Sequence, residues 1–185
     1  MAYAQRVIFF VFCVSVSFGQ RAPQSLFDSV AVTAEQEMRI LALDTITIKT
    51  QAEREELAML FASTKRFEYS FELLSVLCEE YPDNFDYQFL YGGVSGILAS
   101  ELPRVKSLPY VRAMKIAFEA AARLKPDALD IQIVLLQLYT ELPWVLGGSN
   151  KKATQVLEIV KSLSVIEGFL AEGYFYRSTK KLSLI

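Results

Sequence analysis

Three stretches, Glu80-Tyr81-Pro82-Asp83, Leu124-Lys125-Pro126-Asp127 and Ser164-Val165-Ile166-Glu167, each end one helix-like segment and begin the next. They follow one another at intervals of 44 and 40 residues. In the first two, the proline cannot continue a helix and the aspartate after it can cap the following one. Recurrence at this period is typical of helical-hairpin repeats, whose units bury their apolar sides against their neighbours. The sequence therefore predicts an all-α fold of antiparallel helical hairpins stacked as a short α-solenoid.

A second recurrence indicates that one hairpin is a copy of another. Glu101-Leu102-Pro103-x-Val105 matches Glu141-Leu142-Pro143-x-Val145 at an offset of 40 residues, and a basic residue followed by alanine comes after each (Arg112-Ala113 and Lys152-Ala153). One such match could arise by chance. Its shared place before the second helix of each hairpin favours duplication.

Apolar residues at helical spacing and capping signals predict the individual helices. Thr33-x-x-Gln36 and Thr50-x-x-Glu53 are capping boxes, and Ser149 is an N-cap. A ten-residue connection, 100–109, is expected before a helix over 110–124. One face of the first helix is formed by Met38, Leu41, Ala42 and Thr45. The predicted domains are an irregular leader (20–32) and a helical-repeat domain (33–185) with repeats at about 51–84, 85–128 and 129–165 and a capping helix at 166–181.

The first nineteen residues have the three-part pattern of a secretory signal. Arg6 lies in a short head, residues 7–16 are apolar apart from one serine, and small residues precede a cleavage point near Gly19-Gln20. The alternative is a membrane anchor or a buried helix, but about ten apolar residues are too few to span roughly 30 Å of hydrocarbon. We expect an exported protein, periplasmic or extracellular, without a stable membrane span once residues 1–19 are removed.

Composition argues against most catalytic and cofactor chemistry. The chain has no histidine, which removes the commonest general base and every His-based metal site. Its net charge of −2 without a basic block argues against a nucleic-acid partner. Neighbouring carboxylates such as Glu79 and Glu80 lie at helix ends and exposed faces, where solvation explains them. Cys78 lies on a helical apolar pattern and is expected to be a buried hydrophobe, with a reactive thiol as the alternative. We expect no enzyme and no cofactor.

The three repeats and the last predicted helix share a pattern of large, small and aromatic residues. Its members are Leu57-Ala58-x-x-Phe61, Leu74 and Pro82; Tyr91-Gly92, Phe118, Ala121 and Pro126; Leu135-Leu136-x-x-Tyr139, Ala153 and Leu157; and, in an unpaired fourth copy, Phe169-x-x-x-Gly173-x-x-Tyr176. At these residues the chain resembles the tetratricopeptide repeat family, and its stretch 142–149 is similar to a loop of secreted bacterial members. The resemblance covers roughly residues 51–180; the second copy departs by the long connection and the third lacks the terminal proline.

The resemblance implies a binding groove on the concave surface, lined by the first helix of each hairpin. Aromatic residues are also frequent, and helical geometry cannot point all of them inward. Core packing is the first interpretation of these rings, and interface anchors are the alternative. The candidate groove residues by repeat position are Met59, Ser63, Phe89, Gly93, Ile133 and Gln137, and the candidate aromatic anchors are Tyr87, Phe89 and Trp144.

These features favour a non-enzymatic adaptor that binds a protein or an extended peptide. A small-molecule carrier associated with solute transport, with its ligand in a helical cavity, is the alternative from another class. An enzyme is the third hypothesis. Three repeats are near the lower limit for a stable stack, so self-association stays open.

Overall fold

A computed structural model describes residues 32–182, which form helices and turns without a strand. The expected signal segment, 1–19, and all of the leader but Val32 lie outside these residues. The described elements are α2 (Ala34–Asp44), α3 (Gln51–Ser63), α4 (Phe67–Glu80), α5 (Phe85–Glu101), α6 (Arg104–Leu124), α7 (Leu129–Glu141), the short 3₁₀ helix η2 (Trp144–Leu146), α8 (Asn150–Leu163) and α9 (Val165–Leu182).

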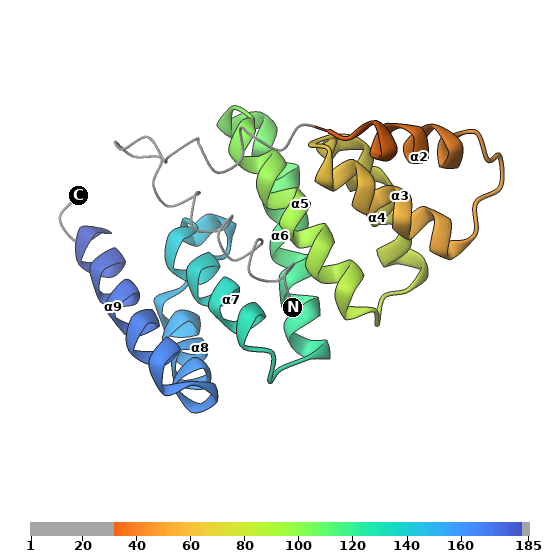
Figure 1. The fold of residues 1–185 in the computed structure, drawn as a ribbon. Coiled ribbons are helices and arrows are strands. Elements are labelled where there is room, and N and C mark those ends of the chain that lie inside the picture. Colours follow the sequence, from red (N-terminus) through yellow and green to blue (C-terminus); the bar gives the residue numbers. More distant parts are fainter. Residues whose placement is uncertain (1–31, 183–185) are drawn as a thin grey trace.

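Consecutive helices pack against one another along the whole described chain. The pairs α3/α4, α5/α6 and α7/α8 are hairpins, and α4/α5, α6/α7 and α8/α9 contacts join them. The helices lie side by side in a row, with α2 at one end and α9 at the other (Figure 1). α9 also packs on α7, so the first helices of successive units touch at this end. The predicted all-α stack of helical hairpins is confirmed.

Local capping signals act as the sequence predicts. The Thr33 and Thr50 hydroxyls accept hydrogen bonds from the third residue of their helices and complete both capping boxes. The Ser149 hydroxyl accepts from the backbone N–H of Lys152. Asp83, expected to cap the helix that follows Pro82, is one residue early: Asn84 is the N-cap, and its side chain accepts from the backbone N–H groups of Asp86 and Tyr87.

The predicted ten-residue connection at 100–109 is wrong. α6 begins at Arg104, so only Leu102 and Pro103 separate it from α5, and Pro109 lies inside the helix. Pro109 cannot donate to the carbonyl of Val105, and its ring crowds that carbonyl. Because it is only the sixth residue of α6, it disturbs one turn at the start. The extensive packing of α6 along α5 offsets that local cost.

The first helix turns the opposite way from its expected apolar face. Ile40 and Leu43 are buried with Leu57 and Phe61, whereas the face of Met38 is exposed. Contacts of Gln36 with Ser63 and of Arg39 with Glu56 make α2 antiparallel to α3. α2 ends at Asp44, because the β-branched run that follows it, residues 45–48, favours extended backbone. The helix therefore shows an apolar side to solvent; its exposed face consists of Met38, Leu41, Ala42 and Thr45.

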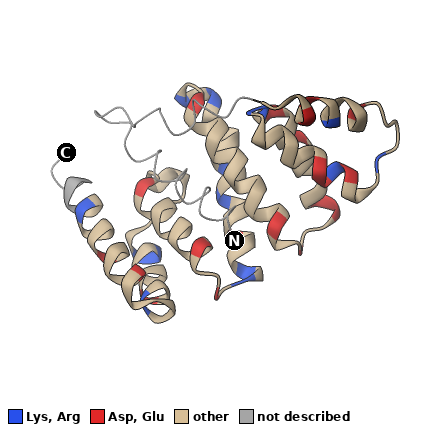
Figure 2. Ribbon diagram, viewed as in Figure 1, with Lys and Arg blue, Asp and Glu red and all other residues tan. Residues whose placement is uncertain are grey.

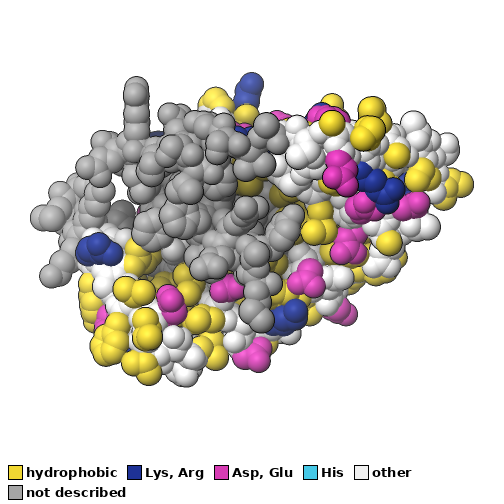
Figure 3. Space-filling view, in the orientation of Figure 1, with side chains coloured by type: hydrophobic (Ala, Val, Ile, Leu, Met, Phe, Trp, Pro, Cys, Tyr) yellow, Lys and Arg dark blue, Asp and Glu magenta, His cyan; other side chains and the backbone are white. Residues whose placement is uncertain are grey.

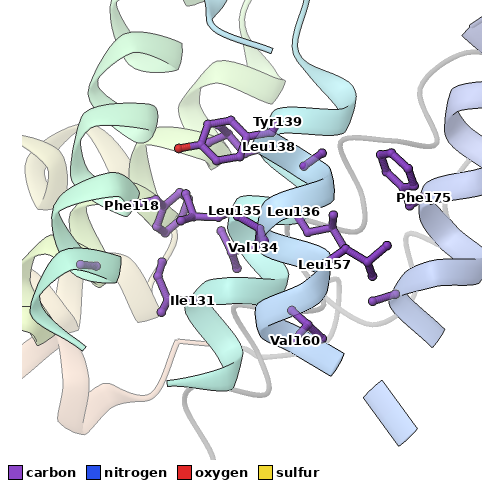
Figure 4. Close-up of a cluster of buried hydrophobic side chains, with 14 of the residues drawn as sticks. Phe118, Ile131, Val134, Leu135, Leu136, Leu138, Tyr139, Leu157, Val160 and Phe175 are labelled. Carbon is purple, nitrogen blue, oxygen red and sulfur yellow. The ribbon is translucent and has the colours of Figure 1, made fainter. Parts of the chain in front are cut away.

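Three apolar clusters follow one another through the stack. The largest joins α6, α7, α8 and α9 around Phe118, which is fully buried (Figure 4). Ile131 and Val134 of α7 and Val160 of α8 are buried in the same cluster. A second cluster lies between α4 and α5 and holds Cys78, as predicted. Each buried aliphatic side chain contributes roughly 1.5–3 kcal/mol to the free energy of unfolding, so the hairpin junctions hold the stack together.

Candidate functional site

The first helices of two successive hairpins are fixed to the preceding turn in the same way. The Gln88 side-chain amide donates to the Pro82 carbonyl at 3.2 Å, and the Gln132 amide donates to the Pro126 carbonyl at 2.9 Å. Both glutamines are buried, and the two bonds are 44 residues apart along the chain. Sequence reasoning missed these residues, although their common spacing from a proline was a visible signal. α5 and α7 therefore present equivalent faces.

Four of the predicted groove residues offer surface on the first helices. Met59 of α3, Phe89 of α5 and Ile133 of α7 are half-buried, and Ser63 at the end of α3 is exposed. The ring of Phe89 is stacked 5.6 Å from Phe85 and lies edge-on 5.9 Å from Phe118, which fixes its orientation. A ring held in this way needs little further ordering when a partner covers it.

Tyr87, a predicted anchor, lies in the core. Its hydroxyl donates to Oε2 of Glu55 at 2.8 Å and accepts from the Gln51 amide at 2.9 Å. The ring lies edge-on to Tyr81, with 6.1 Å between centroids. Burial raises the pKa of Tyr87, and the Glu55 carboxylate adds to this rise. Tyr87 thus ties α5 to α3, and the surface available to a partner is formed by its neighbours.

Gly93 and Gln137 are also buried, although both stand at predicted groove positions. Only 7 % of Gln137 is exposed, and its Oε1 atom has no hydrogen-bond partner. A buried amide oxygen without a donor costs about 1–3 kcal/mol of stability. This acceptor on α7 is therefore left unpaired inside the stack.

Trp144 lies on η2, in the connection between α7 and α8, and not on a first helix. It is 84 % exposed. The connection that carries it is tightly built: Gly147 has a positive φ of 98°, and a Cβ on Gly148 would come within 1.7 Å of the Leu142 carbonyl oxygen. The backbone N–H of Ser149 donates to the Tyr139 carbonyl at 2.8 Å. The Trp144 ring therefore faces solvent from a loop of fixed conformation, and it lies apart from the first-helix face.

One carboxylate, Glu119 of α6, collects several donors at the junction of the second and third hairpins. It accepts from Lys115 at 2.8 Å, from the Tyr139 hydroxyl at 2.7 Å and from Lys152 at 3.5 Å. Burial raises the pKa of Glu119, but the hydrogen bonds and the two lysine charges outweigh burial and leave its pKa lowered. A carboxylate kept ionised and fully partnered is suited to positioning helices, not to exchanging protons.

The other charged residues do not form a cluster of a single sign. Figure 2 shows acidic and basic residues at both ends of the stack, with long uncharged stretches on the helices between them. Within residues 32–182 no group of three or more Cys, Asp or Glu side chains is placed to hold a metal ion. Of the helices described, none has the length and apolar character to cross a bilayer. Comparison of the chain with protein-family models, curated proteins and solved structures found no match.

Proposed function

We propose that the chain is a non-enzymatic adaptor of the tetratricopeptide type, which binds a protein or an extended peptide on the face of its first helices. The observation that carries the proposal is the repeated glutamine–proline bond, which fixes α5 and α7 to their preceding turns in the same way. Equivalent helices in a row give an extended partner equivalent contacts. Half-buried Met59, Phe89 and Ile133 supply apolar surface on this face, and Ser63 is exposed at the end of α3.

This face suits binding better than chemistry. Its side chains are apolar or neutral, so affinity comes from burial of apolar area and a few hydrogen bonds. Phe89 is the best-fixed member, since its ring already rests on Phe85 and Phe118. Aromatic groups held in packed surroundings carry most of the energy in protein interfaces.

The test compares a variant altered on the first-helix face with a control variant altered on a second helix. Ile133→Ser together with Met59→Gln alters the first-helix face, whereas Ile116→Ser makes the same isoleucine change on α6, the second helix of its hairpin, where Ile116 is 65 % exposed. Tagged chains recover bound proteins from the native envelope fraction, and quantitative mass spectrometry compares them. Proteins recovered by the wild type and by Ile116→Ser, but lost by the double variant, support the proposal. Equal recovery by all three chains contradicts it. Circular dichroism checks that each variant is folded.

A small-molecule carrier is the second candidate, and the orphaned Oε1 atom of Gln137 favours it. A ligand that carries an N–H or O–H group could donate to this acceptor. Native mass spectrometry of the purified chain would then show a retained small molecule, which Gln137→Leu would release because leucine accepts no hydrogen bond. Identical spectra without a ligand would argue against a carrier.

We also propose that the chain is exported and loses residues 1–19, on the strength of the charged, apolar and small-residue pattern of that segment. Mass measurement of the protein from its native cells tests this. A mature chain that begins near Gln20 supports export, and a retained Met1 contradicts cleavage.

A further inference from the structure

Both ends of the helical stack expose apolar side chains. At one end, α9 directs a continuous face to solvent, and Phe169 on this face is 71 % exposed. Figure 3 shows apolar side chains gathered over the lower end of α9, and further ones over α2 at the opposite end. Exposed apolar area of this kind on a folded protein marks an interaction surface. The face of α9 consists of Val165, Ile166, Phe169, Leu170 and Tyr176.

Within the described residues, α9 packs on α7 and α8, and no helix follows it. The earlier first helices, α3, α5 and α7, each pack against the helix that comes next in the chain. The side of α9 that carries Phe169, Gly173 and Tyr176 is exposed and has room for a helix.

Two glycines show the difference between a covered helix face and an uncovered one. A Cβ on Gly92 of α5 would come within 2.6 Å of the Phe118 ring, which belongs to α6, the second helix of the same hairpin. A Cβ on Gly173 of α9 would meet nothing within 4 Å. The surface over Gly173 is therefore uncovered. Because glycine has no side chain, another helix can approach the backbone closely at this position.

At the other end, α2 packs on α3 in the way that a second helix packs on the next hairpin, and within the described residues no helix precedes it. It lies antiparallel to α3, as α4 does to α5, and buries one side through Ile40 and Leu43. On its opposite side, Met38 is 65 % exposed and Leu41 is 64 % exposed. A helix with only one covered side in a stacked array has room for a first helix on the other.

We propose that α2 of a second copy of this chain packs antiparallel on α9, so that the two helices complete one hairpin across a head-to-tail junction. This arrangement covers the apolar faces of both ends with one contact and continues the packing already present between α3 and α4. It concerns the ends of the stack and is independent of the partner-binding face of the first helices.

The charges at the two ends fit an antiparallel junction. The first turn of α2 carries Glu35 and Glu37, and its last turn has no basic residue. Glu35 is exposed, and in the antiparallel junction it faces the C-terminal half of α9, where Arg177 is exposed. A negative first turn against a positive last turn is also the arrangement that helix dipoles favour. A symmetric antiparallel pairing of two α9 helices would bring Arg177 near Glu167 in the first turn of the other copy, and the α2 variant described below distinguishes that pairing from the head-to-tail junction.

Because the two contacting surfaces differ, the junction is heterologous and can add copies in series. This property provides the decisive experiment. One full-length variant, Phe169→Glu with Leu170→Glu, loses the α9 face and keeps α2. The other, Met38→Glu with Leu41→Glu, loses the α2 face and keeps α9. Ile116→Glu, on the outer side of α6, is the matched exposed control.

Sedimentation velocity over a hundredfold range of concentration measures association, and circular dichroism confirms that each variant is folded. We expect the wild type and Ile116→Glu to form dimers and longer species as concentration rises, and each double variant to stay monomeric. An equimolar mixture of the two variants should form a dimer that does not grow, because one intact junction is left. Arg177→Glu and Glu35→Arg should each weaken association severalfold, and their combination should restore it.

Three results would overturn the proposal. The wild type could remain monomeric throughout the range. The Met38→Glu, Leu41→Glu variant could dimerise alone, which would indicate a symmetric α9 contact. Finally, both variants could associate like the wild type, which would place the contact elsewhere, including in residues 1–31, which all the chains share.

Discussion

The Tyr139 hydroxyl donates a 2.7 Å hydrogen bond to Oε1 of Glu119, across the junction between the second and third hairpins. Lys115 and Lys152 bind the same carboxylate from α6 and α8. One side chain thus joins three helices. The pKa of Tyr139 is raised, first by burial and then by the neighbouring Glu119 carboxylate, so the phenol stays protonated as the donor.

Glu119→Gln is expected to lower stability at pH 7 and to make it less sensitive to acid. The folded pKa of Glu119 is lowered, whereas an unfolded glutamate titrates near 4.3. The stabilisation from this carboxylate is therefore complete above about pH 4.3 and is lost as pH falls through the lower folded pKa. Urea unfolding of the wild type and the variant at pH 7, 5 and 3 measures this contribution to the free energy of unfolding. A stability difference that is as large at pH 3 as at pH 7 would contradict the ionic role of Glu119.

The three buried glutamines should respond differently to leucine. Gln88→Leu and Gln132→Leu each remove the donor to a proline carbonyl, and each should cost about 1–3 kcal/mol. Gln137→Leu removes an acceptor that has no partner, so it should be neutral or stabilising. Urea denaturation of the three variants compares the free energies of unfolding. A loss at Gln137 equal to the other two would show that its side chain has a partner in solution.

Two glycine-to-alanine substitutions should change the free energy of unfolding in opposite directions. Gly92→Ala brings a methyl group against the fully buried Phe118 ring and should destabilise by roughly 1–3 kcal/mol. Gly173→Ala adds a methyl group in open space within a helix and should stabilise by about 0.5–1 kcal/mol. Thermal and urea unfolding at low protein concentration, where the chain is monomeric, provide the comparison. Similar effects at both sites would mean that α5 and α6 are not in the close contact described.

The Cys78 thiol should be inert in the folded chain. Burial raises its pKa to about 12, so the thiolate fraction at pH 8 is on the order of 10⁻⁴. In a Cys13→Ser background, a thiol reagent at pH 8 should label Cys78 only as fast as the protein unfolds. Labelling should become rapid in urea, where the pKa returns towards 8.5. Rapid labelling of the native chain at pH 8 would refute the burial of this thiol.

Local signals in the sequence were sufficient for several helix starts, whose deciding contacts lie within one helix. The capping boxes at Thr33 and Thr50 form as predicted, because each needs only residues three positions apart. Pro109 shows the limit of such signals. A proline normally ends a helix, but the contact of α6 along α5 tolerates one weak turn, and no local pattern contains that contact.

The candidate site was less accessible to sequence reasoning. Repeat spacing placed Phe89 and Ile133 on first helices, where they offer surface. It could not show that Tyr87 is buried against Glu55 and Gln51, since those partners lie on another hairpin. Whether an aromatic ring on a helix faces a partner or the core depends on the rotation of that helix in the stack.

By itself, the sequence determined the helical class, the period of the repeat and most helix starts, because these follow from prolines, caps and apolar spacing along one segment. Only the tertiary structure decided which faces are covered. Met38 and Phe169 have the apolar character of core residues, yet both are exposed because the stack places no helix beside them. Burial is a property of neighbouring helices, and neighbours are fixed by packing between segments that are distant in the chain.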